Sequence, residues 1–142
     1  VSFVAGSKEV IDTLTPGSEG STFGGYPLAA VVGVYAIKTL VDLKLADNAK
    51  IRGKQLLDHF NDIKDDFPDK IKEIRGKGLL TAFEMYNESH LDGHKVSVEL
   101  LNQGVYAKET HHSTVRFAPA LTIEAWQVDN MAEKLRKVIK EL

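Results

Sequence analysis

The segment after Pro27 constrains the fold more than any other part of this chain. From Leu28 to Ile37 it contains only aliphatic residues, one glycine and one tyrosine. Pro27 suits the first turn of a helix, because the N–H that proline lacks would be unpaired there anyway. A helix that is apolar on all sides is normally buried on all sides. In a chain of 142 residues, we therefore expect another domain or another subunit to cover this helix.

The rest of the pattern predicts an α+β fold, in which helices cover a sheet whose strands pair mostly with near neighbours. A second helix is expected to be capped by Asp47 or Asn48 and to end at Phe67-Pro68. Its apolar positions recur at helical spacing, at Ala49, Gly53, Leu56, Phe60 and Ile63. Shorter helices are expected around 7–12, with Ser7 as N-cap, and around 96–103, with a last helix ending at 142. Strands are expected at 1–4, 71–74, 78–85, 105–108 and 114–117.

These elements predict three segments. Residues 1–25 are expected to be the remaining part of a larger domain, and they contain the glycine-rich loop. Residues 26–60 form a long linker helix and the helix after it. Residues 61–142 contain enough apolar positions to form a small α+β domain of their own.

Composition excludes several functional classes. The chain carries 18 Lys and Arg against 20 Asp and Glu, a net charge of -2, so it lacks the basic surface that nucleic-acid binding needs. The apolar segment is shorter than the roughly 20 residues that span a bilayer, so no membrane span is expected. Cysteine is absent, which excludes disulfides and thiolate chemistry and fits a cytoplasmic protein.

The loop Gly20–Gly25 is a candidate anion contact. Ser21 and Thr22 are adjacent hydroxyl donors on a flexible glycine backbone. The predicted helix that follows adds the positive end of its dipole. An ordinary glycine-rich connection before a helix remains the alternative, because isolated glycine patterns are weak signals.

Arg116 lies within an apolar predicted strand, with Val115 and Phe117 facing the other side. Burying an unpaired arginine is costly. A guanidinium in this position is suited to a bidentate contact with a substrate carboxylate. The alternative is an internal salt bridge to Glu84 or Glu109.

Other polar residues give weaker signals. Structural and catalytic metal sites need three or four convergent ligands. The histidine groups of this chain are His111 and His112 with Glu109, and His90 with His94. Neither group has a third ligand at convincing spacing, so no metal is expected. Lys77 and Lys108 lie in polar stretches, which favours solvated lysines over catalytic ones.

In their order and spacing, several segments resemble class III aminotransferases, which depend on pyridoxal phosphate (PLP). The resemblance covers essentially the whole chain and is strongest to the ornithine aminotransferase branch, over the acetylornithine and 4-aminobutyrate branches. The matching segments are Pro16-Gly17, Gly20–Gly25, Pro27-Leu28, Arg75–Leu80, Ala107–His111 and Val115–Leu121. The resemblance implies the small C-terminal domain of a fold-type I transferase, with an antiparallel sheet covered by helices and preceded by a long inter-domain helix.

The resemblance also implies roles for particular residues. Ser21 and Thr22 would contact the PLP phosphate across a homodimer interface, and Arg116 would bind the α-carboxylate of glutamate or 2-oxoglutarate. The family transfers the δ-amino group of ornithine to 2-oxoglutarate. Glu19, Tyr26 and Ala120 depart from the family pattern, and Glu19 adds negative charge near the phosphate loop.

The same resemblance places the lysine that holds PLP before the segment matching 1–4. Lys8 follows that segment and matches a surface helix, so it is a poor substitute. We therefore expect this chain to be the C-terminal part of an enzyme and to contain none of its catalytic residues. Without the large domain, the chain is expected to bind no PLP and to be inactive. The alternatives are a non-enzymatic dimerisation module, or a fragment of an acetylornithine or 4-aminobutyrate aminotransferase.

Overall fold

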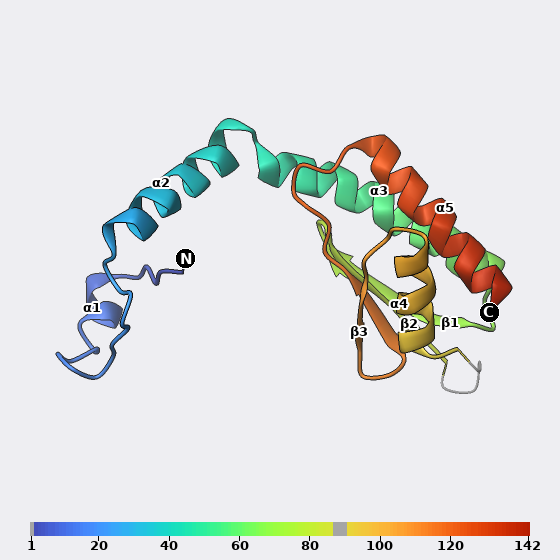
Figure 1. The fold of residues 1–142 in the computed structure, drawn as a ribbon, viewed down its shortest axis with the longest axis horizontal. Coiled ribbons are helices and arrows are strands. Elements are labelled where there is room, and N and C mark those ends of the chain that lie inside the picture. Colours follow the sequence, from blue (N-terminus) through green and yellow to red (C-terminus); the bar gives the residue numbers. More distant parts are fainter. Residues whose placement is uncertain (1, 87–90) are drawn as a thin grey trace. The chain divides into compact units, whose positions relative to one another are not determined.

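The computed structural model describes residues 2–86 and 91–142 and divides into two compact units, Val1–Leu43 and Lys44–Leu142 (Figure 1). The first unit holds helix α1 (Lys8–Ile11), a long loop and helix α2 (Pro27–Asp42). Ser7 caps α1 as predicted, because its side chain accepts a hydrogen bond from the Val10 N–H. The second unit holds all the other elements.

The strand predicted at 1–4 is wrong for the residues that the structure describes. Residues 2–4 have irregular backbone, and Phe3 and Val4 are 70% and 84% exposed. A strand is stable only where a neighbouring strand pairs its N–H and C=O groups. The sheet is built from strands of the second unit, so apolar β-formers alone did not make a strand here.

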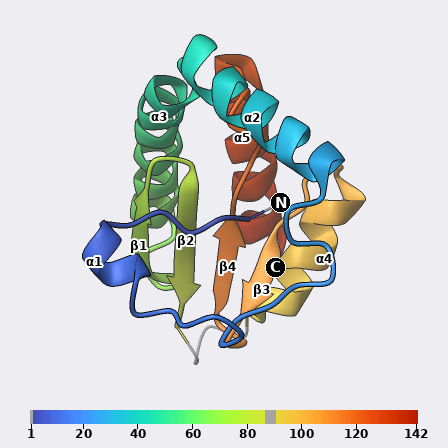
Figure 2. The same cartoon turned by 90° about the vertical axis from the view of Figure 1, so that its left-hand side faces the viewer.

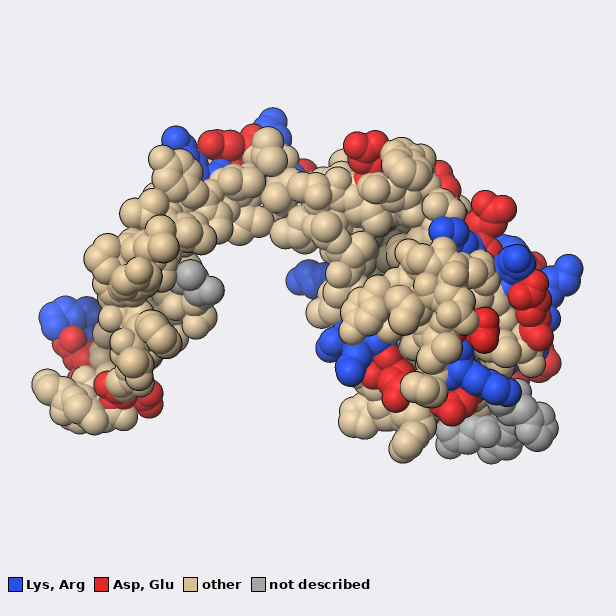
Figure 3. Space-filling model, viewed as in Figure 1, with Lys and Arg blue, Asp and Glu red and all other residues tan. Residues whose placement is uncertain are grey.

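Helix α2 begins at Pro27, as predicted, and ends at Asp42. Each of its side chains is exposed or half-buried, so the described residues of the first unit do not themselves supply the cover that the sequence predicted. The side chains include Val34 at 65% and Val41 at 69% exposure. Figure 3 shows a surface that is mostly uncharged along the first part of this helix. Within residues 2–86 and 91–142, no helix is long and apolar enough to cross a membrane.

The second unit is built on a four-stranded antiparallel sheet in the order β1-β2-β4-β3 (Figure 2). Its strands are β1 (Ile71–Lys77), β2 (Leu80–Met85), β3 (Lys108–Thr110) and β4 (Thr114–Phe117). The sequence predicted strands at 71–74 and 78–85. The first strand instead continues to Lys77, and the turn lies at Gly78, which takes a φ of 57°. The antiparallel sheet covered by helices is confirmed.

Helices α3 (Leu45–Asp66), α4 (Gly93–Asn102) and α5 (Ala125–Glu141) cover one face of this sheet. Periodicity placed the apolar face of α3 correctly, because Gly53, Leu56, Phe60 and Ile63 are all buried. The ring of Phe60 packs edge-on against Phe83 and Phe117, with centroids 6.1 and 5.0 Å away. This core leaves the other sheet face available for polar side chains.

The start of α3 differs from the prediction. The N-cap is Lys44, in a left-handed conformation with φ of 50°, rather than Asp47 or Asn48. The Asn48 side chain instead donates to the carbonyls of Leu121 and Ile123, at 2.8 and 3.0 Å. It therefore fixes the loop that precedes α5, a long-range contact that local capping rules do not anticipate.

The predicted segment 26–60 is shared between the two units. Helix α2 belongs to the first unit, whereas α3 belongs to the second. The reason is the core: Leu56 and Phe60 are fully buried within the second unit.

Candidate functional site

The glycine-rich loop of the first unit is an exposed pair of tight turns. The Gly24 N–H donates to the Ser21 carbonyl at 3.1 Å, and the Tyr26 N–H donates to the Phe23 carbonyl at 3.2 Å. Gly25 takes a φ of 73°, a conformation that favours glycine. These turns place Ser21 and Thr22 immediately before the N-terminus of α2.

The loop offers the donor groups that a phosphate needs. Ser21 and Thr22 are exposed, and among the described residues their hydroxyls have no hydrogen-bond partner, so both can donate to a phosphate oxygen. The first turn of α2, from Pro27 onward, contains no acidic side chain, which keeps its positive dipole end available to an anion. Ser21 also lines a mainly apolar hollow of about 720 Å³, together with Gly33 and Ile37 of α2.

Lys8 does not fit the covalent attachment of PLP. It lies in the short surface helix α1, is 86% exposed, and forms an ion pair with Asp12. A lysine that forms a Schiff base is normally held in the interior of an active site, whereas Lys8 lies on the surface.

Arg116 lies on the open face of the sheet in the second unit. Val115 and Phe117, its neighbours in β4, are fully buried on the helix side. The strand alternation predicted from the sequence is therefore correct. In the ladder, Arg116 is paired with Ala82 of β2 on one side and with Lys108 of β3 on the other.

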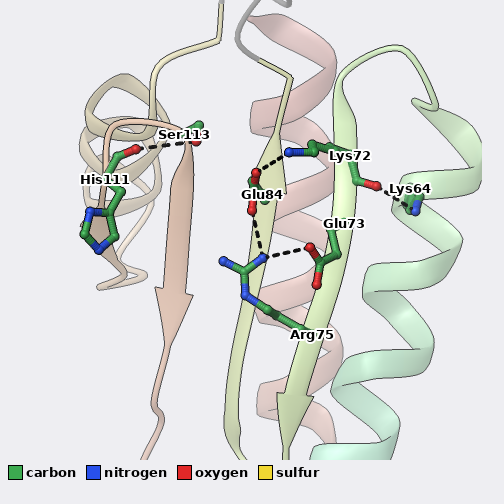
Figure 4. Close-up of polar contacts among 7 residues, drawn as sticks. All are labelled: Lys64, Lys72, Glu73, Arg75, Glu84, His111 and Ser113. Carbon is green, nitrogen blue, oxygen red and sulfur yellow. Dashed lines mark hydrogen bonds and ion pairs between the residues drawn. The ribbon is translucent and has the colours of Figure 1, made fainter.

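Both carboxylates proposed as salt-bridge partners of Arg116 are engaged elsewhere. Glu84 lies 2.8 Å from the Lys72 Nζ and 2.9 Å from Arg75 (Figure 4). Hydrogen bonds from Lys72 and then Arg75 hold the pKa of the Glu84 carboxyl below its ordinary value. The Glu84 carboxylate is thus ion-paired with two side chains of β1 and does not contact Arg116.

Glu109 is turned toward the helices, where its Oε2 lies 2.9 Å from the Nδ1 of His94 in α4. The structure therefore contradicts the internal salt-bridge alternative for both carboxylates. Across residues 2–86 and 91–142, the guanidinium of Arg116 has neither an ion pair nor a hydrogen bond.

The proximity of Lys108 to Arg116 could not be predicted from the sequence. The polar sequence neighbours of Lys108 predict an ordinary solvated lysine. Strand pairing places it directly beside Arg116, on the same face. The sequence indicated that these two strands are joined by a short connection. Which residue of β3 lies opposite Arg116 depends on the exact turn, which only the structure shows.

The described part of the chain contains no cluster of three or more His, Asp or Glu side chains able to hold a metal. His111 and His112 take φ values of 53° and 60° in the turn between β3 and β4. The His111 carbonyl accepts from the Ser113 hydroxyl at 3.4 Å (Figure 4). His90 lies outside the described residues.

Comparison with known proteins identifies the family of this chain. A family model described as aminotransferase class-III matches residues 1–139. The ornithine aminotransferase of Staphylococcus carnosus is 43% identical over 138 residues, which is 97% of this chain and 33% of that protein.

Solved structures of similar fold are also aminotransferases. The ornithine aminotransferase from Toxoplasma gondii matches with a TM-score of 0.84 at 38% identity, over 94% of this chain and 31% of that one. An acetylornithine aminotransferase from Elizabethkingia anophelis matches with a TM-score of 0.82 at 32% identity, over 94% and 33%. The chain spans about a third of the length of these relatives, and it belongs to the class III aminotransferases.

Proposed function

We propose that this chain is the C-terminal part of an ornithine aminotransferase-like enzyme, which transfers the δ-amino group of ornithine to 2-oxoglutarate. One observation carries the proposal: within the described residues, Arg116 of β4 presents a guanidinium without a partner, and both carboxylates considered for it are engaged elsewhere. An arginine held in this way is ready to accept a carboxylate from outside the described residues.

The proposed role of Arg116 is to bind and orient the substrate carboxylate. Its planar guanidinium can make two parallel N–H···O bonds to one carboxylate. A charge-assisted hydrogen bond of this kind contributes about 1.5–3 kcal/mol. Because β4 is anchored by Val115 and Phe117 in the core, the arginine backbone is fixed before the substrate arrives.

The proposed role of Ser21 and Thr22 is to bind the phosphate of PLP. When bound, PLP supplies the electron sink that transamination needs. The two hydroxyls and the N-terminus of α2 would donate to the phosphate and fix its position. In the proposed homodimer, this loop serves the active site of the neighbouring subunit, and the large domain supplies the lysine.

The ornithine branch is supported by sequence more than by shape. The Staphylococcus carnosus ornithine aminotransferase is 43% identical, against 32% for the acetylornithine aminotransferase. The TM-scores of 0.84 and 0.82 do not separate the two branches. A cytoplasmic location is part of the proposal, in keeping with a sequence that has no cysteine.

The exposed apolar side of α2 supports a second candidate, a non-enzymatic dimerisation module. Leu28, Val31 and Val34 are 61%, 53% and 65% exposed, and exposed apolar patches mark interaction surfaces. Light scattering after size exclusion tests this candidate. A dimer that a Val31→Asp/Val34→Asp variant converts to a monomer supports an interface there, whereas a monomer at high concentration contradicts it.

The enzymatic proposal is tested by titrating 2-oxoglutarate against the chain and its Arg116→Ala variant. We expect the variant to lose binding, because the guanidinium is the carboxylate contact. Equal affinity of the two proteins would contradict the proposal.

In a second experiment, PLP and then borohydride are added to the chain, and modified peptides are identified by mass spectrometry. No specifically modified lysine is expected, and stoichiometric modification of Lys8 would contradict the assignment of the PLP lysine to the large domain.

A further inference from the structure

We infer that Lys108 completes the carboxylate site of Arg116 and makes it selective for dicarboxylates over monocarboxylates. This inference rests on the proposed role of Arg116 and adds a residue and a charge preference to it. It is carried by strand register and by the distribution of ion pairs on the open sheet face.

Lys108 and Arg116 are direct partners in the antiparallel ladder between β3 and β4. Directly paired residues point to the same side of the sheet, with Cα atoms about 4.5–5.5 Å apart. Both residues are exposed. Neither has an ion pair or a side-chain hydrogen bond with any of the residues in 2–86 and 91–142.

Two like charges directly opposite each other destabilise a sheet. Elsewhere on this face, the repulsion is relieved by carboxylates. Arg75 lies at the same level, beyond Ala82, and is neutralised by Glu84 at 2.9 Å and Glu73 at 3.3 Å. In the part of the chain that the structure describes, no carboxylate neutralises the pair formed by Lys108 and Arg116 in this way.

The nearest carboxylate in sequence does not relieve the pair. Glu109 follows Lys108 in β3, so its side chain points to the opposite face. There it binds His94 at 2.9 Å. The fold thus keeps two adjacent cations available while directing the local carboxylate away, and an anion bound from outside would relieve their repulsion.

The charge of the pair indicates which anion it prefers. Arg116 can hold one carboxylate through two parallel hydrogen bonds, and Lys108 adds a compact second charge beside it. By Coulomb attraction, a dianion gains from both cations, whereas a monoanion is satisfied mainly by one. A dicarboxylate such as 2-oxoglutarate fits this pair better than a monocarboxylate.

The test uses glutarate and butyrate as probes, because neither reacts and they differ by one carboxylate. Each is titrated against the 142-residue chain at constant ionic strength, and the backbone amide shifts of residues 108 and 116 are followed by NMR. Lys108→Gln is compared with Lys77→Gln, which removes the same charge from the same face at the end of β1, opposite Leu80. Arg116→Gln is the reference for the whole site.

We expect the unaltered chain to bind glutarate more tightly than butyrate. Lys108→Gln should lower glutarate affinity by about two- to fivefold, the range of an exposed ion pair, and should leave butyrate affinity nearly unchanged. Lys77→Gln should behave like the unaltered chain. Unchanged core amide shifts show that each variant keeps its fold.

The outcomes separate the two proposals. If Arg116→Gln abolishes glutarate binding but Lys108→Gln retains the preference for glutarate, the role of Lys108 is refuted and that of Arg116 stands. If Lys77→Gln weakens binding as much as Lys108→Gln, the effect is general charge and the inference is refuted. If Arg116→Gln binds glutarate like the unaltered chain, or if no glutarate binding is detected, both proposals fail.

Discussion

Gly53 of α3 lies directly against Gly78, the turn between β1 and β2. A Cβ added at Gly53 would come within 2.2 Å of both the carbonyl carbon and the carbonyl oxygen of Gly78. These are backbone atoms of a tight turn, so they cannot move aside as a flexible side chain does. The helix therefore packs on the sheet through two glycines.

A Gly53→Ala substitution should destabilise the second unit by about 1–3 kcal/mol, the typical cost of overpacking a core contact. The measurement is the free energy of unfolding from urea titration. Gly20→Ala is the matched control, because a Cβ at Gly20 meets nothing within 4 Å. Equal stability of the two variants would show that α3 and the turn separate easily.

The aromatic cluster around Phe60 should dominate core stability. Its ring is fully buried and contacts Phe83 and Phe117 edge-on. Phe60→Ala should cost about 3–5 kcal/mol, from lost burial and the cavity that remains. Thermal and urea unfolding measure this cost. Tyr106→Ala, at a position 76% exposed, should change stability little, and a comparable loss there would contradict the assignment of the core.

Asp129 of α5 links this helix to α3. Its Oδ1 lies 2.8 Å from the His59 Nε2 and accepts a hydrogen bond from the Gln55 side chain at 2.6 Å. The His59 contact first, and the Gln55 contact second, lower the pKa of the Asp129 carboxyl. The ionised form is therefore favoured in the folded state.

The sign of the pH effect follows from this lowered pKa. Above the ordinary aspartate pKa of about 3.9, Asp129 is ionised in both states and its full stabilisation is present. As pH falls through the lower folded-state pKa, the unfolded state binds the proton more readily and the stabilisation is lost. Asp129→Asn should remove this part of the acid destabilisation.

The measurement is the free energy of unfolding between neutral pH and about pH 3. The difference between the unaltered chain and Asp129→Asn should shrink below about pH 4. Asp62→Asn, on the exposed side of α3, is the control for removal of one charge. A difference that stays constant with pH would contradict the proposed link between Asp129 and His59.

Patterns local to a helix could be predicted from the sequence. The apolar spacing through Leu56 and Phe60 placed the α3 face correctly, and Pro27 marked the start of α2. Both depend on interactions within a few residues, which sequence shows directly.

Long-range pairing could not be predicted in the same way. The apolar start of the chain did not form a strand at residues 2–4, because strand formation depends on a partner. Asn48 was expected to cap its helix, yet it binds carbonyls more than seventy residues away. The neighbour of Arg116 depends on the register between β3 and β4, and a shift of one residue would have reversed which side chains share its face.

The central claim is that Arg116 is the substrate-carboxylate residue of an ornithine aminotransferase-like active site. The most direct measurement replaces the matching segment of the Staphylococcus carnosus ornithine aminotransferase with this chain and determines the KM for 2-oxoglutarate. We predict an active chimera in which Arg116→Gln raises this KM by at least about tenfold. A folded but inactive chimera, or an Arg116→Gln chimera with unchanged KM, would contradict the claim.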